Sequence, residues 1–125
     1  MELANPLLEH LGVRLLGWEP GTCRLALPLE PRHLNRLASL QGGVTATLLD
    51  AACGYAGLQQ QPGGPAAHAV TLSLSINYLA RAAEGEVQAT GRVTGGGRRV
   101  YFASAELHDG QGRLLATAQG AFKRQ

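Results

Sequence analysis

The chain has 125 residues, of which 45% are hydrophobic and 16% are charged, and its formal net charge is +2. This composition is typical of a single globular domain, residues 1–125, and argues against a disordered chain or a nucleic-acid-binding surface. No apolar run approaches the roughly 20 residues that span a bilayer, and the N-terminus lacks a signal-peptide pattern. We therefore expect a soluble, cytoplasmic protein with neither nucleic-acid nor membrane partners.

The first forty residues predict one short helix, two strands and a loop. Asn5 as the N-cap, Pro6 at the first helical position and Gly12 as a stop signal indicate the helix. Residues 13–30 then have the pattern of two short strands joined by a Glu-Pro-Gly turn. Residues 30–40 have mixed polarity and are expected to form a loop.

A long helix and four strands are predicted for the rest of the chain. The helical pattern runs from Gln41 to about Gln60, and the Pro- and Gly-rich residues 59–67 end it. Apolar residues then alternate with Thr, Ser and Asn over residues 70–78, which is typical of a half-buried strand. Three more strands are predicted over residues 85–94, 98–109 and 113–124. This order favours an α+β fold, an antiparallel sheet covering one long apolar helix.

Neither the cysteines nor the histidines form a recognisable metal site. Cys23 and Cys53 lack metal-ligand spacing and are expected to be reduced, packed thiols. The histidines are isolated in sequence and are expected on the surface or in loops; they are His10, His33, His68 and His108.

Two stripes of different character follow from placing residues 42–58 on a helix of 3.6 residues per turn. One stripe is bulky and is expected to face the sheet; it contains Val44, Leu48, Ala51, Tyr55 and Leu58. The opposite stripe has small residues and one acid; it contains Gly43, Thr47, Asp50, Gly54 and Gly57. Glycine inside a helix costs about 0.5–1 kcal/mol relative to alanine, so these glycines indicate either close approach of another backbone or space for a ligand. In a purely structural alternative, this stripe faces a second layer and its acid is neutral or salt-bridged.

The start of this helix is a second candidate feature. Gly42 and Gly43 lie where backbone N–H groups lack helical partners, which suits an anion or a developing oxyanion. Gly42 and Asp50 are eight residues apart, about 12 Å along a helix. One reacting carbonyl cannot contact both, so a shared site needs the amide from one copy of the helix and the carboxylate from another. We therefore expect a site between two subunits.

These residues resemble the hotdog-fold thioesterases, in the phenylacetate-degradation (PaaI-type) and 4-hydroxybenzoyl-CoA thioesterase-like branch. The resemblance runs through HLNRLASLQGGVTATLLDAACGYA, SLSINYLARA and GGGRRVYFASAELHDGQGRLLATAQGAF, with an N-x6-GG-x6-D spacing that ends at Asp50. It covers about residue 30 to the end. It implies a hotdog fold, in which an antiparallel sheet wraps around one central helix. It also implies hydrolysis of an acyl-CoA thioester, with an aryl or small acyl group, to the free acid and coenzyme A.

The resemblance also implies roles for single residues. Asp50 corresponds to the catalytic carboxylate, acting as nucleophile or general base, and Gly42 to the helix-start amide that polarises the thioester carbonyl. Asn35 resembles the asparagine that positions the attacked group or the water, and Thr71 falls where some relatives carry a hydroxyl that assists the water. In the family, the asparagine and the helix-start amide come from one subunit, and the carboxylate and the hydroxyl come from its partner. The implied partner is thus a second copy of the chain, in a homodimer with shared active sites and a tetramer built as a dimer of dimers.

Further candidates concern substrate binding. Gln41 stands where the family usually has histidine, which keeps hydrogen-bonding capacity but removes a titratable group. Gly43 beside it lets a substrate oxygen approach the backbone. Arg98 and Arg99 are candidates for the phosphates of coenzyme A, although two solvated arginines at a turn explain the pattern equally well. Weaker candidates for the same task are Arg81, Lys123 and Arg124.

We expect neither a metal nor a cofactor, because a carboxylate, a water and an oxyanion site suffice and coenzyme A is part of the substrate. Three other functions stay open. A hotdog dehydratase needs a histidine near its carboxylate, and none follows Asp50 within the helix. A non-catalytic acyl-CoA or acyl-carrier binding protein has little need of an unpaired acid there. A purely structural dimer is separated from an enzyme by a turnover assay.

Overall fold

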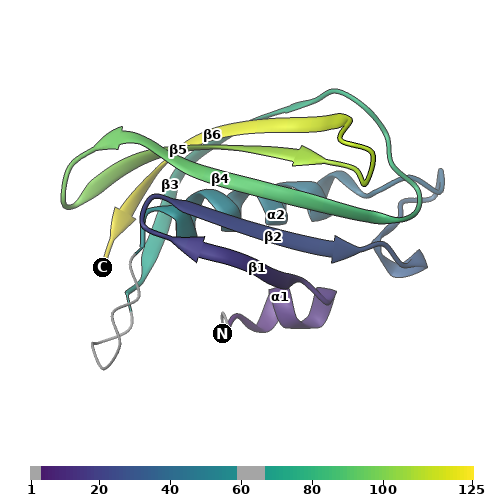
Figure 1. Ribbon diagram of the computed structural model, residues 1–125, viewed down its shortest axis with the longest axis horizontal. Helices are drawn as coiled ribbons and strands as arrows, with labels where there is room; N and C mark the ends of the chain where they lie inside the picture. The colour runs from purple at the N-terminus through teal and green to yellow at the C-terminus, as the bar shows by residue number, and fades with distance from the viewer. Residues whose placement is uncertain (1–3, 59–66) are drawn as a thin grey trace.

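The computed structural model describes residues 4–58 and 67–125 (Figure 1). Within them the elements run in the order α1 (Pro6–Leu11), β1 (Arg14–Glu19), β2 (Thr22–Pro28), the 3₁₀ turn η1 (Pro31–His33), α2 (Gly42–Ala56), β3 (Ala69–Tyr78), β4 (Glu86–Gly96), β5 (Val100–His108) and β6 (Leu114–Arg124). Both helices and all six strands agree with the predicted order. The proline and glycine residues predicted to end the long helix, 62–65, lie outside the described residues.

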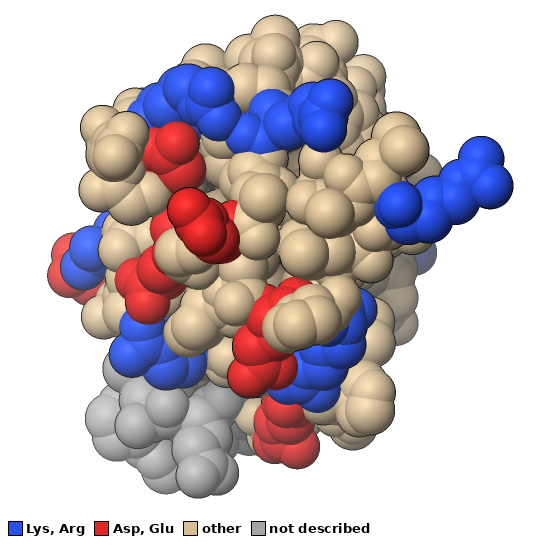
Figure 2. Space-filling view, turned by 90° about the vertical axis from the view of Figure 1, so that its right-hand side faces the viewer, with Lys and Arg blue, Asp and Glu red and all other residues tan. Residues whose placement is uncertain are grey.

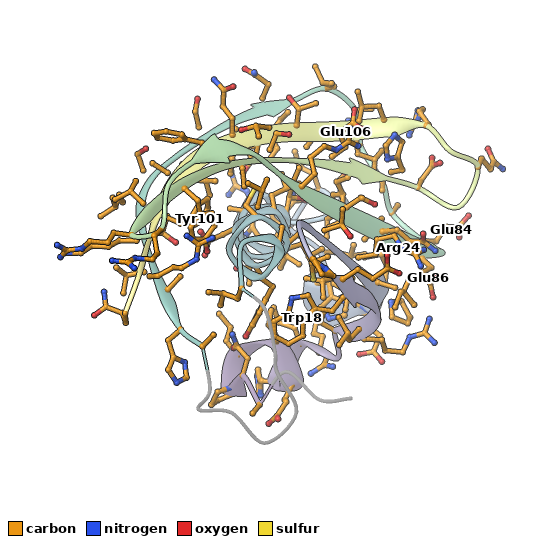
Figure 3. The ribbon with its side chains drawn as sticks, turned by 60° about the vertical axis from the view of Figure 1, so that its left-hand side comes forward. Trp18, Arg24, Glu84, Glu86, Tyr101 and Glu106 are labelled. Carbon is orange, nitrogen blue, oxygen red and sulfur yellow. The ribbon has the colours of Figure 1, made fainter. Side chains whose placement is uncertain are left out.

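The six strands form one antiparallel sheet in the order β1-β2-β4-β5-β6-β3. Figure 3, which looks almost along α2, shows this sheet curving around the helix, with α1 on the open side. The expected α+β architecture, a sheet wrapped around one long helix, is confirmed. Strands β1 and β3 are the two edges of the sheet.

The buried side of α2 differs from the bulky stripe that the sequence predicts. The helix residues that are almost fully buried are Thr45, Leu48, Leu49, Ala52, Cys53 and Ala56. Close approach explains this choice of mostly small residues, since a Cβ added to Gly91 on β4 would meet the Ala52 carbonyl oxygen at 2.1 Å. Tyr55 is only partly buried, and its ring packs edge-on against Trp18 of β1 with centroids 5.2 Å apart. The predicted stripe is therefore right in part: Leu48 and Leu58 are buried, whereas its other members are only partly buried against the core.

Side chains from the strands cap the C-terminal end of α2. Trp18 donates its indole N–H to the carbonyl oxygens of Tyr55 (2.8 Å) and Leu58 (3.0 Å). Arg124 of β6 donates to the Gly57 carbonyl oxygen from Nε (3.0 Å) and Nη2 (2.8 Å). The last carbonyls of a helix have no intrahelical partner, and a cation suits this negative end of the helix dipole. The end of the central helix is therefore fixed by side chains from β1 and β6.

Gly57 owes its place to close packing inside the chain. A Cβ at this position would lie 2.0 Å from Cε2 of Tyr101 on β5. The Tyr101 hydroxyl donates to the Gly54 carbonyl oxygen at 2.6 Å, and the Arg124 guanidinium lies 4.3 Å from the ring centroid. Of the two explanations that the glycines allowed, close approach is the right one for Gly57.

Strand β3 carries a bulge that the alternating pattern does not predict. Its register against β6 shifts between Thr71, which pairs with Phe122, and Ser73, so Leu72 is the extra residue. A bulge moves the following side chains to the other face of a strand. Thr71 therefore shares the inner face with Phe122, while Leu72 is 54% exposed. The predicted half-buried alternation holds for Leu74 and Ile76, which are partly buried. It does not hold for the other apolar residues that were predicted to be buried; Val70, Leu72 and Tyr78 are exposed.

The buried polar residues include one histidine of a predicted loop. Cys23 and Cys53 are free and buried, as predicted. His33 lies within the predicted loop of residues 30–40 but is fully buried rather than at the surface. Its Nε2 donates to the Leu11 carbonyl oxygen (2.7 Å) and its Nδ1 accepts the Glu30 N–H (3.0 Å). The ring therefore joins the end of α1 to the loop that leads to α2.

Charges of both signs share the surface. Figure 2 shows basic and acidic side chains interspersed on one end of the molecule. Ion pairs on the surface include Arg113 with Asp109 (3.4 Å) and Arg92 with Glu106 (3.9 Å). In the described part of the chain, neither helix has the length and apolar character needed to cross a membrane.

Candidate active site

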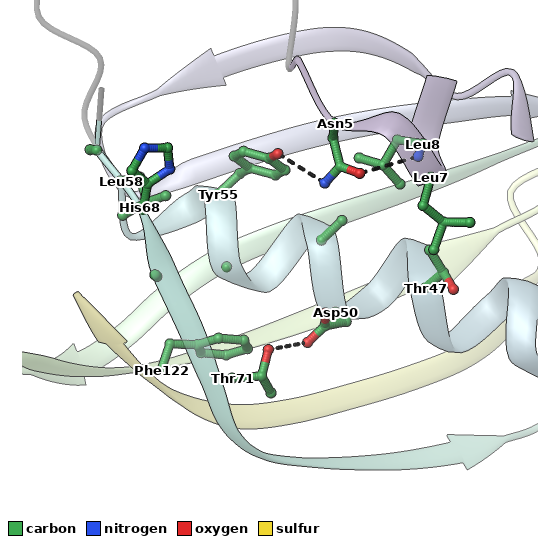
Figure 4. A pocket seen from close by; sticks show the side chains of 14 residues that line it. Asn5, Leu7, Leu8, Thr47, Asp50, Tyr55, Leu58, His68, Thr71 and Phe122 are labelled. Carbon is green, nitrogen blue, oxygen red and sulfur yellow. Dashed lines mark hydrogen bonds between the residues drawn. The ribbon is translucent and has the colours of Figure 1, made fainter. Parts of the chain in front are cut away.

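Asp50 and Thr71 meet between the central helix and the edge strand. The Thr71 Oγ1 donates to Asp50 Oδ1 at 2.7 Å (Figure 4). The bulge at Leu72 produces this contact, because it turns Thr71 toward the helix. Asp50 itself is partly buried rather than deeply buried, so the carboxylate that the sequence placed in an apolar helix is accessible in the single chain.

A cavity opens beside this pair. Its walls come from α1, α2, β3 and β6, and Asp50 and Thr71 both line it (Figure 4). Gly54, one turn after Asp50 on the helix, also lines the cavity. Burial of the Cys53 thiol raises its pKa to about 12, and the negative charge of nearby Asp50 contributes to this rise.

The start of α2 forms a second cavity. Its lining includes Asn35 and Gly42, together with Tyr78 from the end of β3. The Tyr78 hydroxyl donates to the Gly42 carbonyl oxygen at 2.7 Å, which fixes the first turn of the helix. Gln41 is the N-cap residue of α2, and its side-chain Oε1 accepts the Gly42 N–H at 3.2 Å.

Asn35 has a geometry that limits what it can offer to a substrate. Its Oδ1 accepts the backbone N–H groups of Leu37 (2.8 Å) and Ser39 (3.1 Å). The side-chain oxygen thus stabilises the turn before α2. Only the Nδ2 group remains for a ligand, and it is a hydrogen-bond donor.

The predicted residues fall into two groups that one chain does not bring together. Asp50 and Thr71 line the first cavity, whereas Asn35 and Gly42 line the second, and the two cavities share none of their described lining residues. This separation agrees with the distance of about 12 Å expected along the helix. Gly43 is exposed, and a Cβ there would meet nothing within 4 Å.

The predicted phosphate-binding residues lie at the turn between β4 and β5. Arg98 and Arg99 are exposed there, and the turn is closed by a hydrogen bond from the Gly97 N–H to the Val100 carbonyl oxygen (2.7 Å). Arg124 supports the turn, because its Nη1 donates to the carbonyl oxygens of Gly97 and Arg98, both at 2.8 Å. Its guanidinium is therefore occupied by structural contacts, which disfavours Arg124 as a phosphate ligand.

Sequence reasoning missed two contributors to this region. The alternating pattern predicts Tyr78 only as an apolar strand residue, yet its hydroxyl contacts the helix start. Arg124 is predicted only as a weak phosphate candidate, yet it joins the β4–β5 turn to the end of α2. The position of Tyr78 at the end of an alternating strand could have indicated a polar contact, because a tyrosine ring packs while its hydroxyl seeks a hydrogen-bond partner. Among the described residues, no three His, Cys, Asp or Glu side chains are placed to hold a metal ion.

Comparison with known proteins identifies the family. Residues 39–116 match the family described as the thioesterase superfamily. Human acyl-coenzyme A thioesterase 13 is 31% identical over 106 residues, which cover 83% of this chain and 74% of that protein. The solved structure of a mutant of the phenylacetic acid degradation protein PaaI from Thermus thermophilus has a TM-score of 0.83 at 28% identity, covering 97% of this chain and 100% of that one. A conserved protein from Pseudomonas aeruginosa gives a TM-score of 0.88 at 29% identity, covering 98% and 96%. The chain therefore belongs to the thioesterase superfamily, as a hotdog-fold thioester hydrolase of the PaaI type.

Proposed function

We propose that this protein hydrolyses acyl-coenzyme A thioesters, with Asp50 as the catalytic carboxylate. The observation that carries the proposal is the hydrogen bond from Thr71 to Asp50 Oδ1 at the edge of an accessible cavity. A carboxylate that serves only the fold would be expected to lie in an ion pair or a closed hydrogen-bond network. Asp50 instead has one neutral hydroxyl donor and faces a space that a ligand can enter.

The chemistry requires one proton acceptor or nucleophile and one oxyanion site. As a general base, Asp50 takes a proton from water while the water oxygen bonds to the thioester carbonyl carbon. The negative charge moves to the carbonyl oxygen, and the carbon–sulfur bond then breaks to release the acid and the protonated thiol of coenzyme A. As a nucleophile, Asp50 first forms an anhydride and releases the thiol, and water then opens the anhydride. In both routes the reaction needs neither a metal nor a cofactor.

The backbone N–H of Gly42 is the proposed oxyanion donor. It begins α2, where the helix dipole adds to the stabilisation of negative charge. Its present acceptor is the Oε1 of Gln41 at 3.2 Å, a local contact that a substrate oxygen can replace. The free Nδ2 of Asn35 is the proposed second donor near the attacked group or the water.

We further propose that each site is assembled from two subunits. The Asp50 and Gly42 groups line different cavities in one chain, so the partner must supply the missing group. Strand β3 supports this arrangement, because it is an edge strand of the sheet among the described residues and its Val70 and Leu72 are 47% and 54% exposed. Exposed apolar edges of this kind favour pairing with another strand. The proposed homodimer pairs β3 with its copy, and a dimer of dimers stays a prediction.

Arg98 and Arg99 are the proposed ligands of the coenzyme A phosphates. Both are exposed at the β4–β5 turn, near the end of α2 opposite to Gly42. Replacing both with alanine should raise KM for an acyl-CoA with little change in kcat, because uniform binding is lost. A truncated pantetheine thioester, which lacks the nucleotide phosphates, should be almost unaffected. Equal losses for both substrates would contradict this role.

The experiment that tests the proposal measures free thiol release from a panel of acyl-CoAs by wild type and Asp50→Asn. The variant keeps the size of the side chain and removes its charge, and kcat should fall by at least ~100-fold. Its melting temperature and oligomeric state should match the wild type. A folded Asp50→Asn protein with nearly wild-type turnover would end this assignment. Tight binding of acyl-CoA without turnover by the wild type would instead support the alternative, a non-catalytic binding protein.

A further inference from the structure

Tyr78 of the edge strand β3 holds the start of α2. Its hydroxyl donates to the Gly42 carbonyl oxygen at 2.7 Å. Its ring lies beside the same residue, since a Cβ built on Gly42 would be 3.5 Å from the hydroxyl oxygen and 3.6 Å from ring atoms Cε1 and Cζ. Tyr78 is 56% exposed in the single chain, so burial does not force its hydroxyl to find a protein partner.

Helix capping does not explain this bond. At the start of a helix the groups without partners are N–H groups, whereas the first carbonyls already accept N–H groups from one turn later. A cap there accepts hydrogen bonds, as Gln41 does from the Gly42 N–H. Tyr101 shows the contrast, because its hydroxyl donates to the Gly54 carbonyl oxygen near the C-terminal end of α2, where carbonyls lack partners. Tyr78 donates at the opposite end, where no carbonyl needs a donor.

The bond acts on the peptide unit between Gly42 and Gly43. A carbonyl that accepts a hydrogen bond polarises its peptide unit, which makes the N–H of that unit a stronger donor. Here this donor is the Gly43 N–H, for which no acceptor is found among residues 4–58 and 67–125. Two consecutive glycines also have the greatest backbone freedom. A fixed tyrosine restricts this freedom where donors must be preorganised to stabilise an oxyanion.

The sheet gives Tyr78 a fixed base. Tyr78 is the last residue of β3, and Leu79 after it donates its N–H to the Leu115 carbonyl oxygen at 2.8 Å. Arg81 then donates from Nε to the Ser39 hydroxyl at 3.1 Å, which ties the loop before α2 to the same end of the strand. The glycine-rich helix start is therefore positioned by the sheet.

The proposed dimer places Tyr78 close to the other half of the site. A two-fold axis relates the two copies, so β3 meets its copy in the antiparallel direction. Thr71 and Tyr78 lie toward opposite ends of β3 and share its inner face, since their partners on β6 are both buried. Tyr78 of one subunit then lies near Thr71 and Asp50 of the partner subunit.

We infer that Tyr78 is a positioning residue of the oxyanion site. Its hydroxyl fixes the Gly42–Gly43 peptide and strengthens the N–H of that peptide toward the charge that develops on the thioester carbonyl oxygen. The inference rests on the proposed function and adds a residue to it. The hydroxyl keeps its proton and forms no bond to the substrate, so it acts through the backbone. Strand β3 thereby orients both halves of the reaction, the carboxylate through Thr71 and the oxyanion donors through Tyr78.

The test removes the hydroxyl and keeps the ring. In the thiol-release assay, Tyr78→Phe should lower kcat by roughly 5- to 10-fold, as expected for one neutral hydrogen bond and less than for loss of an oxyanion donor itself. KM should stay within about twofold, because the bond serves the transition state rather than substrate binding. The oligomeric state and the melting temperature should stay close to those of the wild type, since the bond is exposed.

The matched control is Tyr101→Phe. It removes the same kind of bond, from a tyrosine hydroxyl to a carbonyl of α2, at the other end of the helix. Because Tyr101 is buried, this variant should have a lower melting temperature, while its kcat per folded molecule should equal that of the wild type. The two variants thus separate an effect on rate from an effect on stability.

A second readout is independent of turnover. In amide proton–nitrogen NMR spectra, the Gly43 signal should shift in Tyr78→Phe, because its peptide unit loses a hydrogen bond at the carbonyl. The same signal should stay in place in Tyr101→Phe.

Three results would overturn the inference while the proposed function stands. They are a wild-type kcat in Tyr78→Phe, a loss confined to KM, and an unchanged Gly43 amide signal. Absence of turnover by the wild-type protein with every acyl-CoA of the panel contradicts the proposed function itself, and the inference with it.

Discussion

Asp50 is held at one of its two carboxylate oxygens. Thr71 donates to Oδ1, and no other side chain in the described part of the chain donates to Asp50. The Oδ2 atom is thus available to a water or a thioester carbon, while the bonded oxygen sets the plane of the carboxylate. In the proposed reaction, fixing the carboxylate in this way removes reorganisation from the catalytic step.

The first prediction concerns this hydroxyl. Thr71→Val keeps the shape of the side chain and removes the donor, so kcat should fall by roughly 10-fold or more, as expected for a hydrogen bond to a charged group. KM should change little, because the bond orients the carboxylate rather than the substrate. Thr71→Ser restores the donor and should recover most of the activity in the same thiol-release assay. An unchanged kcat in Thr71→Val would show that the bond has no catalytic role.

The second prediction concerns His33, which is buried and makes two hydrogen bonds with the backbone. His33→Ala leaves the Leu11 carbonyl and the Glu30 N–H without these partners and should lower the free energy of unfolding by about 2–4 kcal/mol. Urea denaturation measures this loss. His10→Ala, at an exposed position, is the control and should change stability by less than about 0.5 kcal/mol.

At the scale of elements, the backbone of strand β3 depends on a glycine in the neighbouring strand β6. A Cβ at Gly120 of β6 would lie 2.5 Å from the Ser73 carbonyl oxygen, beside the bulge. Gly120 therefore permits the backbone geometry that turns Thr71 toward Asp50. The Asp50–Thr71 contact thus depends on a residue that touches neither side chain.

The third prediction follows from this dependence. Gly120→Ala should push β3 outward, lower stability by more than about 1 kcal/mol and reduce kcat through the lost Thr71–Asp50 contact. Gly112→Ala is not a fair control, since its φ of +83° strains alanine by itself. Ala121→Gly, next along β6, tests whether any change in backbone freedom has the same effect. Loss of stability without loss of kcat per folded molecule would separate Gly120 from the site.

The sequence predicted both α-helices and all six strands of the described chain, because periods of 3.6 and 2 residues report helix and strand directly, whereas the 3₁₀ turn η1 fell in a predicted loop. It also predicted Asp50, Gly42, Asn35 and Thr71 as candidates, through a motif and a family resemblance. It did not predict the bulge in β3, because strict alternation assumes that each residue of one strand pairs with one residue of the next. It left Ala52, Cys53 and Ala56 out of the sheet-facing side of α2, because that side was predicted from bulky residues alone, whereas the curved sheet approaches the helix closely enough to bury small ones. His33 and Arg124 were missed because isolated polar residues carry no signal of their tertiary partners.

At the scale of the whole molecule, the proposed dimer uses one strand for both association and catalysis. In the proposed dimer, β3 supplies Thr71 to the site with one face and pairs with the partner through its edge. In the part of the chain that the structure describes, the exposed residues of this strand include Val70, Leu72 and Tyr78. The cytoplasmic location likewise stays a prediction, consistent with two free thiols.

The fourth prediction tests the assembly. Leu72→Lys places a charge on the exposed edge strand, which disfavours strand pairing, so the protein should sediment as a monomer and lose activity. Leu16→Lys places the same charge on β1, the other edge of the sheet, and should leave both properties unchanged. A fully active monomer at assay concentration would contradict the two-subunit site.

The fifth prediction concerns alkaline pH. Burial raises the pKa of Cys23 from 9.0 to about 12, and it raises the pKa of Tyr101 from 10.0 to about 12 against the opposing charge of Arg124. Because the unfolded chain loses these protons at lower pH than the folded protein, stability is fully present below about pH 9 and falls as pH rises toward 12. Urea midpoints between pH 8 and 11 should decrease accordingly. The slope should become shallower in a variant with Cys23 and Cys53 both replaced by alanine; an identical slope would contradict the linkage.

The two buried thiols can report how often parts of the folded chain open to solvent. Cys23 belongs to β2 and Cys53 to α2, so the sheet and the central helix each carry one buried thiol. An alkylating reagent modifies a thiolate that is accessible, and neither thiol meets that condition while the layers are together. Labelling rates under native conditions therefore measure how often each layer separates. Equal rates would mean that helix and sheet open as one unit, whereas faster labelling of Cys53 would mean that the central helix leaves the sheet before the sheet itself comes apart.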